Sequence, residues 1–275
     1  MIEELVRRLR EDKVSGAGKL SEDALRILKE ASFLVEASGR EEFLLRMEEI
    51  AQEISSARPS MTPLANLSLL FLKLLREEGE GDLEALRQKA AETAEKLILL
   101  SASARERASS NAARLLERRE RIITCSLSSA VISALKKAKE EGKEIEVLAA
   151  LSPGPSGNYG ELLAQALREE GIEVSVFPDE ELEIQARRAT RALVGADTVL
   201  PDGSFINGSP TLSLAIAARK NNIPLFSVCE TFKIRRDPAI LLEPGFDLVP
   251  SDLVCAYITE KGIIRPSEIS RQQLL

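Results

Sequence analysis

The sequence predicts an α/β protein, in which a helical N-terminal domain (residues 1–118) is followed by a Rossmann-like parallel sheet with helices on both faces (residues 119–275). Two observations lead to this fold class. Apolar residues recur at helical spacing throughout the first part of the chain. From Ile122 onward, short β-prone runs alternate with helical segments, which is the pattern of a parallel sheet.

In the first part, residues 20–37, 41–54 and 62–77 carry apolar stripes separated by Gly or Pro, and each predicts a helix. Residues 83–115 then carry one stripe rich in Ala, with Asp82 at its start. This predicts a helix of roughly 35 residues, about 50 Å long at 1.5 Å per residue. A helix of that length forms the spine of a domain or part of a subunit interface.

In the second part, the β-prone runs are residues 122–125, 145–149, 174–177, 192–195 and 225–228. The helical patterns between them are residues 129–141, 159–170, 180–191 and 211–221. The glycine fingerprint of dinucleotide-binding sheets, GxGxxG, is missing. We therefore expect no nicotinamide site and no other cofactor.

Composition limits the chemistry. The chain has no histidine, which excludes Ser-His-Asp and Cys-His catalysis, and its three cysteines are too widely spaced for a zinc knuckle. We therefore expect no metal, and acid–base work would fall to Asp, Glu, Cys, Lys or Tyr. A net charge of −7 argues against nucleic acid as a partner.

The pattern of hydropathy favours a cytoplasmic protein. No apolar run is long enough to span a membrane, so we expect no membrane partner, and the charged start of the chain does not have the form of a signal peptide. Few Asn and Gln, no Trp and many Glu, Arg and Lys are typical of a thermophile.

Asp197 is the leading site candidate. It ends a β-prone run and precedes a Pro-Asp-Gly turn, and ligands of open α/β sheets bind at the carboxyl ends of strands. The alternative is that Asp197 only caps its own turn.

Three strand-to-helix transitions, at residues 124–129, 152–160 and 207–211, are rich in small polar residues. Each offers backbone N–H groups at a helix start, where a phosphate can bind, although each can equally be an ordinary capped helix. In the third, Ser209 is placed as the N-cap, with Pro210 in the first turn. The candidate ligand-binding residues are Ser128, Ser129, Ser156, Gly157, Asn158, Tyr159, Gly160, Asn207, Gly208, Ser209 and Thr211.

Several of these segments resemble the translation initiation factor 2B alpha/beta/delta family, which includes methylthioribose-1-phosphate isomerase and ribose-1,5-bisphosphate isomerase. The segments that carry the resemblance are residues 12–17, 58–61, 123–124, 194–197, 202–207, 223–226, 230–233 and 245–262. The resemblance covers nearly the whole chain, and it implies a homodimer or a larger homo-oligomer built on the C-terminal domain. It also makes Lys233 a candidate phosphate ligand, against the alternative of a solvated lysine.

In the isomerases that the chain resembles, a Cys in a Thr-His-Cys-Asn turn acts together with the Asp of the Gly-Ala-Asp motif. Here an ungapped match places Ser126 at the Cys position, while a shift of one residue restores Cys125. The resemblance therefore gives Asp197, Cys125 and, less favourably, Ser126 as catalytic candidates. A serine without a neighbouring base is a poor acid or base near neutral pH.

The chain departs from the same isomerases in its substrate loops. Their Glu-x-Arg-Pro segment reads Ser-Pro-Gly-Pro at residues 152–155, and their Asn-Lys pair reads Asn207-Gly208. These changes remove the charge-assisted hydrogen bonds that dominate phosphate binding. The residues that follow, 156–160, could offer a neutral cradle lined by backbone.

Two functions follow. The favoured one is an initiation factor 2B-like protein, non-catalytic or regulatory, that binds a phosphorylated small metabolite such as a sugar phosphate or a nucleotide. The alternative is an aldose–ketose isomerase of a ribose phosphate such as ribose-1,5-bisphosphate, with Asp197 moving the proton.

Overall fold

The computed structural model describes residues 1–77, 81–155, 157–239 and 241–272. The chain forms two compact units, Met1–Ser103 and Ala104–Leu275, and the longest helix, α5 (Leu83–Leu115), runs through the division. No helix among the described residues combines the length and the apolar character needed to cross a membrane.

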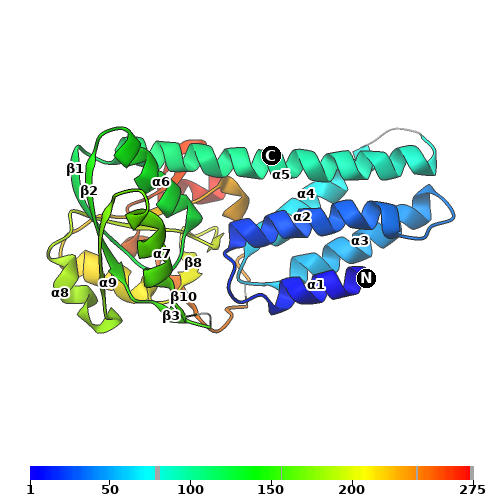
Figure 1. Ribbon diagram of the computed structural model, residues 1–275. Helices are drawn as coiled ribbons and strands as arrows, with labels where there is room; N and C mark the ends of the chain where they lie inside the picture. Colours follow the sequence, from blue (N-terminus) through cyan, green and yellow to red (C-terminus); the bar gives the residue numbers. More distant parts are fainter. Residues whose placement is uncertain (78–80, 156, 240, 273–275) are drawn as a thin grey trace. The chain divides into compact units, whose positions relative to one another are not determined.

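The first unit is helical, as predicted. Besides the first part of α5 it contains α1 (Ile2–Glu11), α2 (Ala17–Leu34), α3 (Arg40–Ala57) and α4 (Thr62–Glu77), which Figure 1 shows as a packed group. One stripe of each helix is buried, with Leu28, Met47 and Phe71 among the fully covered side chains. This burial of one face per helix is the arrangement that the apolar spacing predicts.

The second unit is built on a seven-stranded sheet with the order β12-β11-β9-β6-β1-β2-β5. Its strands are β1 (Arg119–Thr124), β2 (Glu144–Ala150), β5 (Glu173–Phe177), β6 (Arg191–Val194), β9 (Leu225–Val228), β11 (Ala256–Thr259) and β12 (Gly262–Ile264). All neighbouring pairs are parallel except β11 and β12, which form an antiparallel pair.

Helices cover both faces of this sheet. On one face, α6 (Ser129–Glu140), α7 (Tyr159–Arg168) and the end of α5 share an apolar core with the sheet. On the other, α8 (Leu182–Ala186) and α9 (Thr211–Lys220) share a second core. Figure 1 shows α6 and α7 beside β1 and β2. The predicted fold class is therefore confirmed.

The structure adds smaller elements that the sequence analysis does not predict. A second sheet has the order β10-β8-β7, and two short strands form a hairpin before α7. These strands are β3 (Pro153–Gly154), β4 (Gly157–Asn158), β7 (Thr198–Val199), β8 (Phe205–Gly208) and β10 (Phe246–Val249). The 3₁₀ helices are η1 (Asp179–Glu181), η2 (Thr231–Lys233), η3 (Ser251–Leu253) and η4 (Pro266–Arg271).

One predicted helix is too long. The helix expected over residues 180–191 is replaced by η1 and by α8, which has five residues. Because α8 is short, it covers only part of its face of the sheet. Four strands also begin earlier than predicted, at the charged residues Arg119, Glu144, Glu173 and Arg191.

Candidate functional site

The candidate site lies at the carboxyl edge of the sheet, where β9, β6 and β1 are neighbours. β1 delivers Cys125 and Ser126, β6 leads to Asp197, and β9 leads to Lys233. Parallel strands bring their carboxyl ends to one edge, so residues from distant parts of the sequence meet here.

Asp197 is half-buried between β6 and β7, and its backbone N–H donates to the carbonyl of Ile206 at 2.8 Å. Its carboxylate lies close enough to Lys233 to favour the charged ammonium. Lys233 is not the solvated lysine of the alternative, because it is only 8% exposed and its Nζ lies 3.2 Å from Oε2 of Glu230.

Cys125 belongs to a buried polar network. The Thr211 hydroxyl donates to the carbonyl of Gly208 at 2.6 Å and accepts from Nδ2 of Asn207 at 2.9 Å. The Cys125 thiol, 3.3 Å from Oγ1 of Thr211, is then left as the donor in that contact. Burial raises the pKa of the Cys125 thiol to about 12, so the thiol stays protonated at neutral pH.

Ser126 adopts a left-handed backbone conformation, with φ of 61°. Its N–H donates to Oγ of Ser152 at 2.9 Å. A Cβ placed on Gly208 would meet Oγ of Ser126 at 2.5 Å, so the serine occupies the space beside this glycine. The Ser126 hydroxyl thus occupies the space that the Cβ of any side chain at residue 208 would need.

Ser128 is the N-cap of α6, and its side chain accepts from the N–H of Val131 at 3.3 Å. The same hydroxyl packs against Gly195, where a Cβ would meet it at 2.6 Å. The N–H groups of Ser129 and Ala130 have no partner among the residues that the structure describes. The start of α6 therefore keeps backbone donors beside the strand that leads to Asp197.

The start of α7 is different, because its first two donors are used. The N–H of Tyr159 donates to the carbonyl of Ser152 at 3.1 Å, and that of Gly160 donates to the carbonyl of Leu151 at 3.0 Å. The Tyr159 ring lies over Gly154 of the hairpin. Gly157 and Asn158 form strand β4 and are exposed. The remaining candidate of this segment, Ser156, lies outside the described residues.

At α9 the predicted N-cap is wrong. The N-cap is Pro210, after a cis peptide bond, and Ser209 lies one residue before it. The Ser209 hydroxyl donates to Oδ1 of Asp247 at 2.7 Å, and the N–H of Leu212 donates to Oδ2 at 2.9 Å. A carboxylate of the chain itself therefore occupies the helix start at which we expected a phosphate.

Two residues of this edge were not predicted, Glu230 and Asp247. Glu230 is 3% exposed and forms the ion pair with Lys233 described above. Asp247 lies on β10, in the second sheet. Only the three-residue spacing between Glu230 and Lys233 was visible in the sequence, and it is a weak signal without the turn that joins them.

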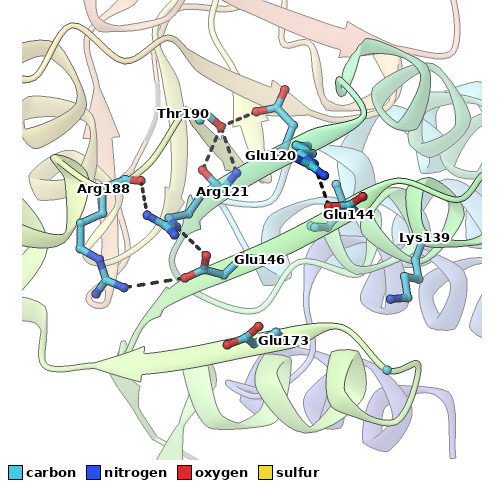
Figure 2. Close-up of a pocket in the computed structure, with 11 residues that line it drawn as sticks. Glu120, Arg121, Lys139, Glu144, Glu146, Glu173, Arg188 and Thr190 are labelled. Atoms are coloured by element: carbon cyan, nitrogen blue, oxygen red, sulfur yellow. Dashed lines mark hydrogen bonds and ion pairs between the residues drawn. The ribbon is translucent and has the colours of Figure 1, made fainter.

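A separate pocket, also not predicted, lies at the opposite, amino edge of the sheet and has a volume of about 540 Å³. Figure 2 shows its charged lining. Arg121 donates to Glu146 at 2.6 Å, and Arg188 lies 3.7 Å from the same carboxylate. Glu173 and Lys139 also line it, and neither has an ion pair with another described residue.

The short helix α8 explains this pocket. Arg121 and Glu146 lie on the same face as Ile123 and Leu148, the face that α8 and α9 cover. Because α8 has only five residues, the amino ends of the strands stay open, and charged side chains occupy them. The signal in the sequence was the alternation Arg-Glu-Arg at residues 119–121 and Glu-Ile-Glu at residues 144–146.

No group of three or more Cys, Asp or Glu that could hold a metal ion occurs within the described ranges. The chemistry available at the carboxyl edge is thus that of one buried ammonium, the carboxylates of Asp197 and Glu230, a protonated thiol and the backbone donors of α6.

The sequence model of the initiation factor 2 subunit family matches residues 13–240 of the chain. The chain belongs to this family. A Pyrococcus furiosus protein, named as translation initiation factor eIF-2B subunit 2-like, is 31% identical over 279 residues, which cover 95% of each chain. A Methanocaldococcus jannaschii protein, named ribose 1,5-bisphosphate isomerase, is 28% identical over 97% of this chain and 92% of its own length.

The fold of this initiation factor 2 family member is also that of solved relatives. The Pyrococcus horikoshii translation initiation factor eIF-2B superposes with a TM-score of 0.83 at 26% identity, covering 96% of this chain and 97% of that one. A subunit of the tetrameric eIF2B-beta2-delta2 complex from C. thermophilum has a TM-score of 0.84 at 21% identity, covering 98% and 93%. The resemblance stated from the sequence is therefore confirmed.

Proposed function

We propose that the chain binds a phosphorylated small metabolite at the carboxyl edge of its sheet and does not isomerise it. Cys125 carries this proposal. The Cys125 thiol has a pKa of about 12 and donates a hydrogen bond to Oγ1 of Thr211. A protonated thiol of this kind is not a nucleophile or a general base at neutral pH. The hydroxyl of Ser126 is packed against Gly208 and has no hydrogen bond with a base among the described residues.

The binding role rests on Lys233, Asp197 and the start of α6. Lys233 is a buried ammonium and can supply a charge-assisted hydrogen bond to a phosphate. The N–H groups of Ser129 and Ala130 are further donors at a helix start. Ser128 and Gly195, in contact with each other, link that helix start to the strand of Asp197.

The alternative, an aldose–ketose isomerase, is favoured by Asp197. Its half-buried carboxylate lies at the edge where ligands of such sheets bind, and a relative of similar length is named ribose 1,5-bisphosphate isomerase. In this function Asp197 would move the proton, and Cys125 would have to lose its proton in spite of burial.

Phosphorus and proton NMR of ribose-1,5-bisphosphate and methylthioribose-1-phosphate, each mixed with the protein, separate the two functions. Line broadening without conversion is expected for a binding protein. Ketose that forms with the wild type but not with Asp197→Asn would establish an isomerase and overturn the proposal. If neither line broadening nor conversion is observed, both sugars are excluded as ligands.

We also propose that the protein is cytoplasmic and assembles as a homodimer or a larger homo-oligomer through its C-terminal unit. The presence of a tetrameric complex among the proteins of the same fold supports assembly. Light scattering coupled to size exclusion tests it, and a monomer at micromolar concentration would contradict it.

A further inference from the structure

The amino-edge pocket is large enough for a small molecule, and the function proposed above does not use it. Its volume of about 540 Å³ lies within the range of small-molecule sites in proteins. The pocket wraps around the first residues of β1, β2 and β5, and its wall also includes the end of α6. All of these elements belong to the second unit. A molecule bound here would be a second ligand, separate from the one at the carboxyl edge.

Several charged side chains of the pocket wall are paired with one another, as the dashed lines in Figure 2 show. Nε of Arg119 lies 2.9 Å from Oε2 of Glu144. Nε of Arg121 lies 2.6 Å from Oε2 of Glu146, and Nη2 of Arg188 lies 3.7 Å from Oε1 of the same glutamate. These three arginines are therefore already engaged by the carboxylates of β2.

Glu173, the first residue of β5, is an exposed carboxylate of this wall. The sheet register sets it opposite Glu146, and alternation along the strands places both side chains on the face that α8 and α9 cover. Like charges in such a position repel each other. Glu173 has no hydrogen bond or ion pair with any residue drawn in Figure 2. Its carboxylate is therefore open to a cation from outside the chain.

Lys139, in the last turn of α6, is a cation of the same wall. It is exposed, and Figure 2 shows it without a hydrogen bond or ion pair to the residues drawn. α6 packs on the face of the sheet opposite to the one that carries Glu173. The free ammonium and the free carboxylate thus come from different faces and meet the pocket at different places. A ligand that contacts both must carry two charges of opposite sign, separated by a chain.

We propose that the amino-edge pocket binds an ω-amino acid, a small zwitterion with an ammonium at one end of an aliphatic chain and a carboxylate at the other. The ammonium lies at Glu173 and the carboxylate lies at Lys139. Ile145, which also lines the pocket, offers an apolar contact to the chain. Simple ions fit less well, because a phosphate would face Glu173 and a polyamine would face Lys139. This inference does not rest on the function proposed for the carboxyl edge.

Ligand-observed saturation-transfer NMR at low ionic strength tests this, with 6-aminohexanoate as the probe. Hexanoate and hexylamine have a chain of the same length with one charge each, and glycine has both charges without the chain. 6-Aminohexanoate should bind about 2- to 5-fold more tightly than hexanoate or hexylamine, which is the effect of one exposed ion pair. Glycine should bind more weakly than 6-aminohexanoate, because it cannot contact both side chains.

Two variants separate the two ends of the probe. Glu173→Gln and Lys139→Met should each weaken 6-aminohexanoate by about 2- to 5-fold, since each removes one ion pair. Glu173→Gln should not weaken hexanoate, and Lys139→Met should not weaken hexylamine. Glu140→Gln is the matched control, because Glu140 is an exposed carboxylate next to Lys139 that does not line the pocket. Circular dichroism melts establish that each variant is folded.

Three results would overturn the inference: a wild type that does not bind 6-aminohexanoate, an analogue with a single charge that binds as tightly as 6-aminohexanoate, or an affinity that Glu173→Gln and Glu140→Gln change equally. None of them bears on the function proposed for the carboxyl edge, which is tested with sugar phosphates. Failure of that function would likewise leave this inference in place.

Discussion

Oγ of Ser126 lies 2.5 Å from the point at which a Cβ on Gly208 would be placed. By the family resemblance described in the sequence analysis, Gly208 lies where the isomerases are expected to carry the lysine of their Asn-Lys pair, and Ser126 lies where an ungapped match places their cysteine. The structure shows that these two departures are in contact. A lysine at residue 208 cannot be restored unless Ser126 moves.

Gly208→Ala should therefore destabilise the protein by about 1–3 kcal/mol, the range for inserting a methyl group into a packed site. Urea unfolding measures this. Gly39→Ala is the control, because a Cβ on Gly39 meets nothing within 4 Å. If Gly208→Ala lowers the free energy of unfolding no more than the control does, the Ser126 hydroxyl does not fill the space beside Gly208. Adding Ser126→Gly should recover most of the loss.

Asp197→Asn should leave the fold intact and weaken ligand binding or turnover. The change is isosteric, and it removes one of the two carboxylates that raise the pKa of Lys233, so that pKa should fall. Thermal melts and titration with ribose 5-phosphate measure the two effects. Unfolding caused by this change would show that Asp197 is a structural residue and would remove it from the site.

The three thiols should differ in reactivity. Cys255 is exposed, whereas Cys125 and Cys229 are buried. In the folded protein a thiol reagent such as dithionitrobenzoate should modify Cys255 alone, and it should reach the other two only after unfolding. Cys255→Ser should abolish the fast reaction. Fast modification of Cys125 would contradict its burial and would reopen the isomerase mechanism.

The two buried thiols also predict how stability depends on pH. Burial raises the pKa of both Cys125 and Cys229 to about 12, whereas a thiol in the unfolded chain titrates near pH 9. Between these values the folded state binds more protons, so stability falls as pH rises. The slope is about 1.4 kcal/mol per pH unit for each thiol.

Urea unfolding at pH 8, 9.5 and 10.5 measures this loss, and Cys229→Ala should reduce its slope by about 1.4 kcal/mol per pH unit, the contribution of one thiol. A slope that does not change in this variant would assign the alkaline loss of stability to other groups.

At the amino-edge pocket, Glu146→Gln should cost about 1 kcal/mol, because two arginines lose their shared carboxylate. Glu144→Gln should cost little, since the Arg119–Glu144 pair is far more exposed. Unfolding at low and at high salt tests both, and the effect of Glu146→Gln should shrink in salt. Binding of ribose 5-phosphate at the other edge should not change in either variant.

Much of the fold was predictable because burial leaves a periodic trace in the sequence. The spacing of apolar residues predicted the helices of the first unit and the alternation of strands and helices in the second unit. The length of the helix after residue 180 was not predictable, because the pattern at residues 187–191 is compatible with a helix. The strand starts at Arg119 and Glu144 were hidden for a related reason: their charged side chains do not look like strand residues.

For the candidate site, the sequence by itself determined which residues follow the strands, including Asp197, Cys125 and Lys233, and which chemistry the absence of histidine excludes. Only the tertiary structure decided the protonation, the hydrogen-bond partners and the ion pairs of these residues. Burial keeps Cys125 protonated, Asp247 occupies the start of α9, and the turn at η2 sets Lys233 against Glu230. Hydrogen-bond partners and solvent exposure depend on segments far apart in the chain, so local sequence patterns do not contain them.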